Sequence, residues 1–294
     1  MARALLPDRS GVSNWVVLIV LIIVVGATLG AYYVYVIPKA GPAPLQAQPG
    51  DQLQVSYIGY FQDTGRVFDT SLLSVAQDNA TWPKAVSFAW RAAWSSLSFT
   101  VGGNASSGTI KGFDYGVRGM MIGQTKVITV TPDLGYGPMD STLVFVHRLT
   151  ETIPVHVTMN ATTFSSTYGE TPTSGSNVTD PVYHWPAQVY VANGIVTVTN
   201  SPTPGGTVRA YNEWPVTVVS VDDTADNGTG AITIQNHLDP SAIDALGGPA
   251  PNGKTFYISA VDLSAGTYTL NFNREVVGRT LVFQVTVLSI TRVV

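Results

Sequence analysis

The sequence predicts a mainly β protein of the α+β class, and its composition and the spacing of its turns favour this. Val, Thr, Gly and Tyr are frequent, and short runs of alternating apolar and polar residues recur between turns rich in Gly and Pro. Only 12% of the 294 residues are charged, about half the usual share. There is no cysteine, which excludes disulfides, thiolate nucleophiles and Cys-ligated zinc. The formal charge of -4, without a basic stripe, gives nucleic-acid binding no support.

The first expected element is a transmembrane helix at residues 15–37, after a short tail at 1–14. No residue in this stretch is charged, Trp15 begins it, and Tyr32, Tyr33 and Tyr35 lie near its other end. As a helix, about 23 residues at ~1.5 Å each cross a hydrocarbon layer of ~30 Å. The alternative is a cleaved signal peptide, but its apolar region is normally only ~7–15 residues long. We therefore expect an uncleaved anchor.

Charges at the ends of this span predict its orientation. Arg3 and Arg9 precede the span and Lys39 follows it, which favours a cytoplasmic N-terminus. The protein is thus expected in the cell membrane, as a single-pass protein with its C-terminal body outside the cytoplasm. Asn-x-Ser/Thr triplets agree with exposure there; they begin at Asn79, Asn104, Asn160, Asn177 and Asn227. Residues 38–49, rich in proline, are expected to form an extended linker.

Residues 50–137 alternate between strands and turns. Strands are expected at 53–57, 97–102 and 126–130, and the turn at 63–65 returns a strand that starts at Val67. Between them, 71–96 is a long excursion with three tryptophans and a possible helix at 89–94. This excursion is either packed surface or an extra wall of a substrate groove. A short helix should start near Ile110 and run to Met121, and a turn should occupy 132–137.

Residues 138–271 are expected to form a β-rich inserted domain. Trp185-Pro186 and Trp214-Pro215 each precede an alternating strand, which suggests an internal repeat. The two tryptophans are either core residues or anchors for a client polypeptide. His184 and His237 have no ligand-like spacing, so no metal site is expected. The strand candidates are 152–159, 187–191, 195–199, 216–221, 231–235, 255–261 and 267–272.

Several short motifs carry a resemblance to one family. They are Gly50 to Tyr60, Val67 to Ser71, Ile110 to Asp114, Pro132 to Gly137 and, only at the C-terminus, Gly278 to Val285. Together they resemble the FKBP-type peptidyl-prolyl isomerase, which implies an antiparallel half-barrel wrapped on a short helix. Residues 272–294 would then complete the domain begun at 50–137.

The junction after the interruption resembles that of SlyD-like and archaeal long members of the family. It reads Asn271-Phe272-Asn273, then Gly278 and Leu281, with Arg274 where those proteins often have His. In them an insert-in-flap (IF) domain replaces the flap and acts as a chaperone for unfolded chains. The resemblance therefore implies a chaperone insert at 138–271, about twice the usual length.

The resemblance also implies the site residues. Tyr57, Phe68 and Phe283 would wall the proline ring, and Phe113 would form the floor where many members have Trp. Tyr136 would donate a hydrogen bond to the peptide carbonyl, and Asp69 would orient the twisting amide. The remaining positions, implied to contact the substrate, are Leu97, Thr109 and Ile110. Leu97 and Thr109 depart from the usual aromatic and aliphatic residues, so substrate preference should differ.

The leading hypothesis is a membrane-anchored prolyl isomerase with chaperone activity on exported proteins. It needs no cofactor, because twisting an X-Pro bond requires neither nucleophile nor proton shuttle. Its partners would be unfolded or proline-containing polypeptides, and it is expected to be monomeric. The alternative is a catalytically weak binding module that acts through the insert. A surface-layer or immunoglobulin-like protein fits the composition of the insert but not residues 50–137.

Overall fold

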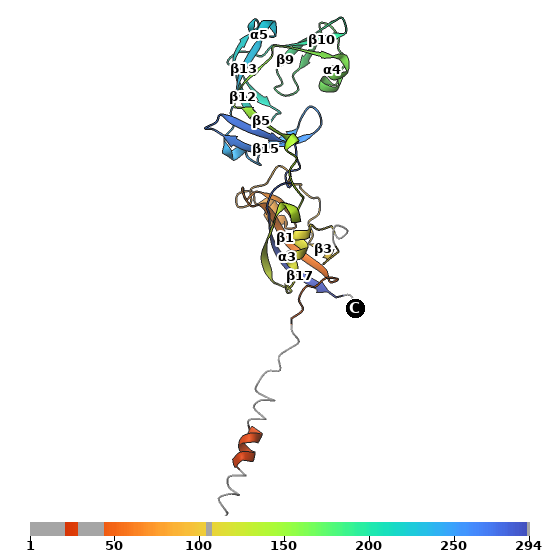
Figure 1. The fold of residues 1–294 in the computed structure, drawn as a ribbon, viewed down its shortest axis with the longest axis vertical. Coiled ribbons are helices and arrows are strands. Elements are labelled where there is room, and N and C mark those ends of the chain that lie inside the picture. The colour runs from red at the N-terminus through yellow and green to blue at the C-terminus, as the bar shows by residue number, and fades with distance from the viewer. Residues whose placement is uncertain (1–20, 29–43, 104–107, 293–294) are drawn as a thin grey trace, which may run out of the picture. The chain divides into compact units, whose positions relative to one another are not determined.

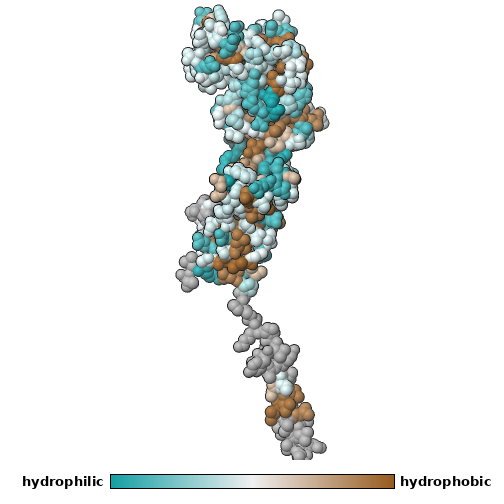
Figure 2. All heavy atoms as spheres, turned by 180° about the vertical axis from the view of Figure 1, so that it is seen from behind, coloured by the Kyte–Doolittle hydropathy of each residue, from teal (hydrophilic) through white to brown (hydrophobic). Residues whose placement is uncertain are grey.

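The computed structural model describes residues 21–28, 44–103 and 108–292. The chain divides into two compact units, residues 1–45 and 46–294. In the first unit, residues 21–28 are helical with exposed side chains, and their visible face in Figure 2 is largely hydrophobic. The rest of the expected span at 15–37, the tail at 1–14 and residues 38–43 lie outside the described residues. Within the described ranges, no helix is long and apolar enough to cross a bilayer.

The second unit begins inside the stretch that was expected to be a linker. Ala47 is only 1% exposed, and its N–H donates to the Met120 carbonyl over 2.8 Å. Gln46 forms a β-bridge with Met121. The prediction of an extended linker as far as Pro49 was therefore wrong for its last residues, because Ala47 packs into the core of the second unit.

A five-stranded antiparallel sheet forms the first part of this unit (Figure 1). The strand order is β2-β1-β17-β4, and β3 pairs with β1. The C-terminal strand β17 is central, since Phe283 lies opposite Gly59 of β1 on one side and Ile128 of β4 on the other. The expected mainly β architecture with few helices is confirmed. The strands are β1 (Gln52–Phe61), β2 (Val67–Thr70), β3 (Leu97–Thr100), β4 (Thr125–Val130) and β17 (Leu281–Thr291).

Helix α3 (Lys111–Val117) packs closely against β4. A Cβ on Gly112 would lie 2.5 Å from Val130 Cγ1, so glycine is what permits this approach. The predicted continuation to Met121 was wrong: the helix ends at Val117, and Gly119 then adopts a φ of 79°. The close packing places Phe113, which is 3% exposed, at the centre of the core formed by this sheet.

The excursion at 71–96 contains helix α2 (Leu73–Gln77). The possible helix at 89–94 is absent, and this stretch is irregular. Trp90 is 61% exposed and its ring centroid lies 5.5 Å from that of Trp94. Without a helix, the stretch is free to follow the edge of the sheet and bring Arg91 to Asp69 of β2.

Between β4 and β17 the chain forms three further four-stranded antiparallel sheets. We call residues 144–271, from β5 to β16, the interposed segment. Its strands are β5 (Val144–Arg148), β6 (Thr150–Ile153), β7 (His156–Asn160), β8 (Asn177–Thr179), β9 (Pro186–Ala192), β10 (Ile195–Asn200), β11 (Thr207–Ala210), β12 (Trp214–Asp222), β13 (Ala231–Asn236), β14 (Gly247–Pro249), β15 (Thr255–Asp262) and β16 (Thr267–Asn271). Short helical elements lie around and between them, namely η2 (Pro132–Leu134), η3 (Ser141–Leu143), α4 (Ala161–Tyr168), α5 (Ala225–Gly228) and η4 (Pro240–Ala242).

The three sheets share one topology and are nested in the sequence. The chain first contributes one strand to each in turn, β5, β6 and β7, and then returns to complete them in the reverse order. Each return adds a short strand and a hairpin. The orders are β7-β10-β9-β8, β6-β13-β12-β11 and β5-β16-β15-β14. The interposed segment is therefore built from three equivalent units.

A buried aromatic–asparagine pair recurs in each sheet. Trp185 Nε1 donates to Asn200 Oδ1 over 2.9 Å, and Trp214 Nε1 donates to Asn236 Oδ1 over 2.8 Å. In the third sheet, Asn271 Nδ2 donates to the Tyr257 hydroxyl oxygen over 2.8 Å. Each Asn is the last residue of the second hairpin strand. The suspected repeat of the two Trp-Pro segments is thus confirmed, since each Trp lies two residues before the residue opposite its Asn; in the third sheet Tyr257 lies directly opposite Asn271. Both tryptophans are core residues, at 2% and 1% exposure.

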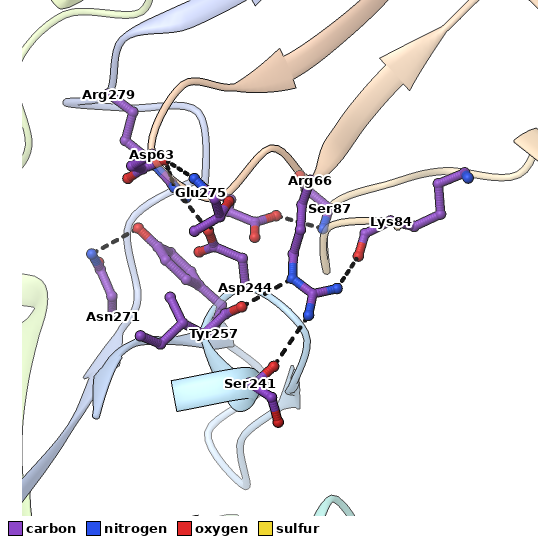
Figure 3. Close-up of polar contacts among 12 residues, drawn as sticks. Asp63, Arg66, Lys84, Ser87, Ser241, Asp244, Tyr257, Asn271, Glu275 and Arg279 are labelled. Carbon is purple, nitrogen blue, oxygen red and sulfur yellow. Dashed lines mark hydrogen bonds and ion pairs between the residues drawn. The ribbon is translucent and has the colours of Figure 1, made fainter. Parts of the chain in front are cut away.

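Polar contacts join the interposed segment to the five-stranded sheet (Figure 3). Asp244, next to η4, is 1% exposed, and its Oδ2 accepts from Arg279 Nη2 over 2.8 Å and from Thr64 Oγ1 over 2.9 Å. Arg66 donates from Nε to the Ile243 carbonyl over 3.1 Å and from Nη2 to the Ser241 carbonyl over 3.1 Å. We call these residues the junction cluster. It ties the β1–β2 turn and the approach to β17 to one loop.

Candidate active site

Four aromatic side chains from four different elements meet beside the five-stranded sheet. Phe283 of β17 lies at the centre, with ring centroids 5.1 Å from Phe113, 5.6 Å from Phe68 and 6.4 Å from Tyr57. The contacts with Phe113 and Phe68 are edge-to-face, the arrangement in which an aromatic edge meets a neighbouring π face. Because all four are at most 8% exposed, they form a rigid apolar wall.

These rings border a small cavity of about 80 Å³. The structure brings every site residue expected from the sequence to this one cavity, although they come from both ends of the second unit. Gly108 is the one lining residue that the sequence analysis did not name. The expected residues that line it are Tyr57, Phe68, Asp69, Leu97, Thr109, Ile110, Phe113, Tyr136 and Phe283.

One edge of the cavity is polar. The Tyr57 hydroxyl donates to Asp69 Oδ2 over 2.6 Å, and Arg91 donates to Asp69 Oδ1 and, over 3.3 Å, to the Tyr57 hydroxyl oxygen. Burial, followed by the charge of Asp69, raises the pKa of Tyr57, so this hydroxyl remains protonated at neutral pH. The three groups hold one another in place at the rim. Asp69 is therefore fixed beside the apolar wall.

Sequence reasoning missed Arg91 as part of this site. It lies in the irregular stretch at 89–94, where no periodicity indicates which side chains turn inward. The available signal was compositional, because Arg91 is a lone charged residue among tryptophans. Its guanidinium also lies 5.9 Å from the Trp94 ring centroid, which is within the range of a cation–π contact. Part of the excursion thus belongs to the wall of the site.

Tyr136 stands at the opposite side of the opening. It follows η2 and is 39% exposed, with the Arg274 guanidinium 5.2 Å from its ring centroid. Partial burial raises the pKa of Tyr136, and the smaller effect of Arg274 lowers it. The hydroxyl thus keeps its proton at neutral pH and can donate a hydrogen bond. It can reach a group held in the cavity mouth, while Asp69 offers an acceptor there.

The arrangement suits a small apolar ring joined to a polar amide. Aromatic faces line the interior, and the hydrogen-bonding groups are confined to the rim. No acid–base pair, nucleophile or cofactor is needed for such a cavity to favour a twisted amide over a planar one. The C-terminal strand is indispensable to it, because Phe283 touches each of the other three rings.

Comparison with known proteins agrees with this geometry. Residues 43–148 match the family model described as FKBP-type peptidyl-prolyl cis-trans isomerase. We call the matched region the FKBP-type domain, after the family that it resembles. Strand β17 lies outside the matched residues, and pairing with β1 and β4 brings it into that domain. The site of the FKBP-type domain is therefore assembled from the matched region and the C-terminus.

Curated relatives share this domain at moderate identity. "FK506-binding protein 2" of Gibberella zeae is 35% identical over 111 residues, which cover 35% of this chain and 46% of that protein. "Short-type peptidyl-prolyl cis-trans isomerase" of Methanocaldococcus jannaschii is 33% identical over 95 residues, covering 32% of this chain and 54% of that protein. The chain thus spans about half the length of these relatives, 46% and 54%. The family match ends at residue 148 and so leaves most of the interposed segment unmatched.

Proposed function

We propose that this protein is a peptidyl-prolyl cis-trans isomerase. The observation that carries the proposal is the single cavity around which the aromatic rings, Asp69 and Tyr136 converge. The names of the relatives that match the FKBP-type domain support the same activity. The proline ring enters between Tyr57, Phe68 and Phe283, and its amide lies at the polar rim.

The rate enhancement comes from differential binding of the twisted amide. Rotation about X-Pro has a barrier of ~18–20 kcal/mol because it breaks amide resonance. The apolar wall removes water from the carbonyl, which favours the less polar twisted form. Tyr136 donates to the peptide carbonyl as it turns, and Asp69, held by Tyr57 and Arg91, orients the rim. Each ~1.4 kcal/mol of such preference multiplies the rate about tenfold.

A protease-coupled assay on a four-residue prolyl peptide, run with the full chain, tests the activity. Tyr136→Phe and Asp69→Ala should each lower kcat/KM about tenfold, equivalent to the loss of one ~1.4 kcal/mol interaction. Tyr115→Phe is the matched control, since Tyr115 is 49% exposed on α3 and lies away from the cavity. An FKBP-type macrolide should inhibit the wild type. If neither substitution nor the macrolide lowers turnover, the assignment of this cavity as the isomerase site is wrong.

We further propose that the interposed segment acts as a chaperone of the IF type for exported clients. Its position between Tyr136 and Phe283 in the sequence supports this, since that is where a flap over the cavity would lie. Exposed apolar side chains on its strands provide contact area, including Phe145 at 47%, Val146 at 69% and Tyr190 at 62%. A catalytically weak FKBP-type binding module remains the second candidate, favoured by the unusual Leu97 and Thr109.

Deleting residues 139–271 tests the chaperone role. The cut ends are neighbours, because the Asn273 side chain donates to the Asp140 carbonyl over 2.9 Å and the Gly278 N–H donates to the Gly137 carbonyl over 2.9 Å. A two-residue linker should therefore close the domain. The full chain should suppress aggregation of an unfolded client better than the shortened chain. Equal performance would contradict the chaperone role.

Membrane anchoring is likewise proposed, from the uncharged stretch at 15–37 and the basic residues before it. The full chain should sediment with membranes, and alkaline carbonate should fail to extract it. External protease should degrade the body in intact cells when the C-terminal part faces outward. A chain that appears in the soluble fraction, or a body protected from protease, would contradict the anchor or its orientation.

A further inference from the structure

A second, larger cavity adjoins the prolyl site. Its volume is about 770 Å³, within the ~300–1,000 Å³ range of ligand-binding pockets. Phe68, Asp69 and Tyr136 line both cavities, so the two are immediate neighbours. The FKBP-type domain supplies one wall from the excursion after β2. The interposed segment supplies another part of the lining from β15, and residues 272–276, which follow that segment, add to it.

The interior of the larger cavity is mostly apolar. Phe256 and Phe272 contact each other with ring centroids 5.8 Å apart, and Val276 and Leu143 complete this side. On the opposite side lie Phe68 and aliphatic side chains of the excursion. Such a surface accommodates bulky apolar side chains of a polypeptide. It lies where residues flanking a bound proline must pass.

The mouth of this cavity carries positive charge without compensation. Lys254 and Arg274 are both exposed, and neither forms an ion pair among the described residues. Two acidic side chains also line the cavity. Asp69 is paired with Arg91, and Glu275 is 4% exposed with one oxygen accepting the Ser87 N–H over 2.7 Å. Burial raises the pKa of Glu275.

We propose that this cavity is an extended substrate subsite that selects clients with an acidic residue near the isomerised proline, beside apolar neighbours. The inference rests on the proposed isomerase activity and names the substrate class of that activity. The apolar walls bind the neighbouring side chains, Lys254 holds the carboxylate, and Arg274, whose guanidinium lies over the Tyr136 ring, adds a weaker attraction. Because one wall belongs to the interposed segment, that segment contributes directly to substrate choice in each turnover.

Exchange NMR on eight-residue prolyl peptides tests the proposal with the full chain. One peptide series carries Glu, Gln or Lys three residues before the proline, and a second carries them three residues after it. In at least one series, the Glu peptide should be turned over about threefold to tenfold faster than the Lys peptide. That range follows from partly exposed ion pairs replaced by like-charge repulsion. Salt at ~0.5 M should reduce the preference, since the charges are exposed.

Substitutions locate the preference. Lys254→Gln should bring the Glu-to-Lys ratio below about twofold, and Lys254→Arg should retain it. Arg148→Gln is the matched control, because Arg148 is an exposed cation on β5 outside the cavity. Its ratio should equal that of the wild type. Equal rates for Glu and Lys peptides in both series, or a preference that survives in Lys254→Gln, overturns the subsite.

A four-residue prolyl peptide distinguishes failure of the proposed subsite from failure of the proposed isomerase activity. Wild-type turnover of that peptide together with indifference to flanking charge refutes the subsite alone. Absence of turnover refutes the isomerase proposal. In that case the affinities of the same eight-residue Glu and Lys peptides, measured by calorimetry, are compared instead of their rates. Tighter binding of the Glu peptide, lost in Lys254→Gln, would still support the subsite; equal affinities would overturn it.

Discussion

Asp244→Ala is the sharpest perturbation of the junction cluster. Asp244 lies in the interposed segment and is buried, whereas its partner Arg279 lies two residues before β17 and shows 12% side-chain exposure. After the substitution, the Arg279 guanidinium keeps its ion pair with Asp63, whose side chain is 64% exposed. It also removes the acceptor of Thr64 Oγ1. The change therefore strips the FKBP-type domain of its buried ionic contact with the neighbouring loop.

The distances give the expected size of the effect. Unit charges 2.8 Å apart attract by about 6 kcal/mol at an effective dielectric constant near 20. Retained contact with Asp63 and entry of water offset part of this, and breaking a buried pair typically costs ~3–5 kcal/mol. Asp244 also adopts a φ of 54°, which costs alanine roughly 1 kcal/mol. We expect the free energy of unfolding to fall by about 4 kcal/mol.

Urea unfolding and amide hydrogen exchange measure this effect. The Val86 N–H, which donates to the Asp244 carbonyl over 3.1 Å, should exchange much faster in the variant. Asp244→Asn is the matched control: it keeps the left-handed preference and a hydrogen-bond acceptor, so it should lose less stability. Adding Arg279→Met to Asp244→Ala should recover part of the loss. A loss below about 1 kcal/mol in Asp244→Ala would refute the reasoning.

Three other predictions concern the fold. Asn236→Leu should cost about 1–3 kcal/mol in urea unfolding, since a buried indole N–H loses its acceptor; an unchanged midpoint would contradict this. Gly112→Ala should cost about 1–3 kcal/mol, because the new Cβ meets Val130, and Val130→Ala in the same chain should restore stability; failure to do so would exclude this clash. Arg292 lowers the pKa of Asp51, so this carboxylate contributes fully to stability above its unfolded pKa of 3.8, and the contribution is lost as pH falls through the lower folded pKa. Asp51→Asn should therefore flatten that part of an acid-unfolding curve followed by circular dichroism. A curve identical to that of the wild type would contradict this.

Much of the FKBP-type domain was predictable from local patterns. The alternation of Leu53, Val55 and Tyr57 marks one buried face of a strand, and that face packs into the core. The motif residues from Tyr57 to Phe283 were expected to share a site, and the structure gathers them around one cavity. These features depend on neighbouring residues or on recurring family motifs.

The features that sequence analysis missed depend on contacts between distant segments. Arg91 reaches Asp69 only because its stretch is irregular, and irregular backbone carries no periodic signal. In the sequence, nothing distinguishes Asp244 from the other acidic residues. Its importance depends on the contact between the loop after η4 and Arg279, which only the structure shows. The third sheet was hidden because it has no Trp-Pro: its aromatic partner of asparagine is Tyr257, which lies directly opposite Asn271 in the hairpin. Its role becomes visible only once the strands are paired.

The nested sheets imply an order of folding. The hairpins β9–β10, β12–β13 and β15–β16 each join strands that are close in sequence, so they can form as soon as they are synthesised. Loop closure is shortest for the β7–β10 pair, longer for β6–β13 and longest for β5–β16. The sheet that contains β7 should thus close first, the sheet that contains β6 second and the sheet that contains β5 last. Only then does β17 enter between β1 and β4, so the prolyl cavity is the last part of the second unit to be completed.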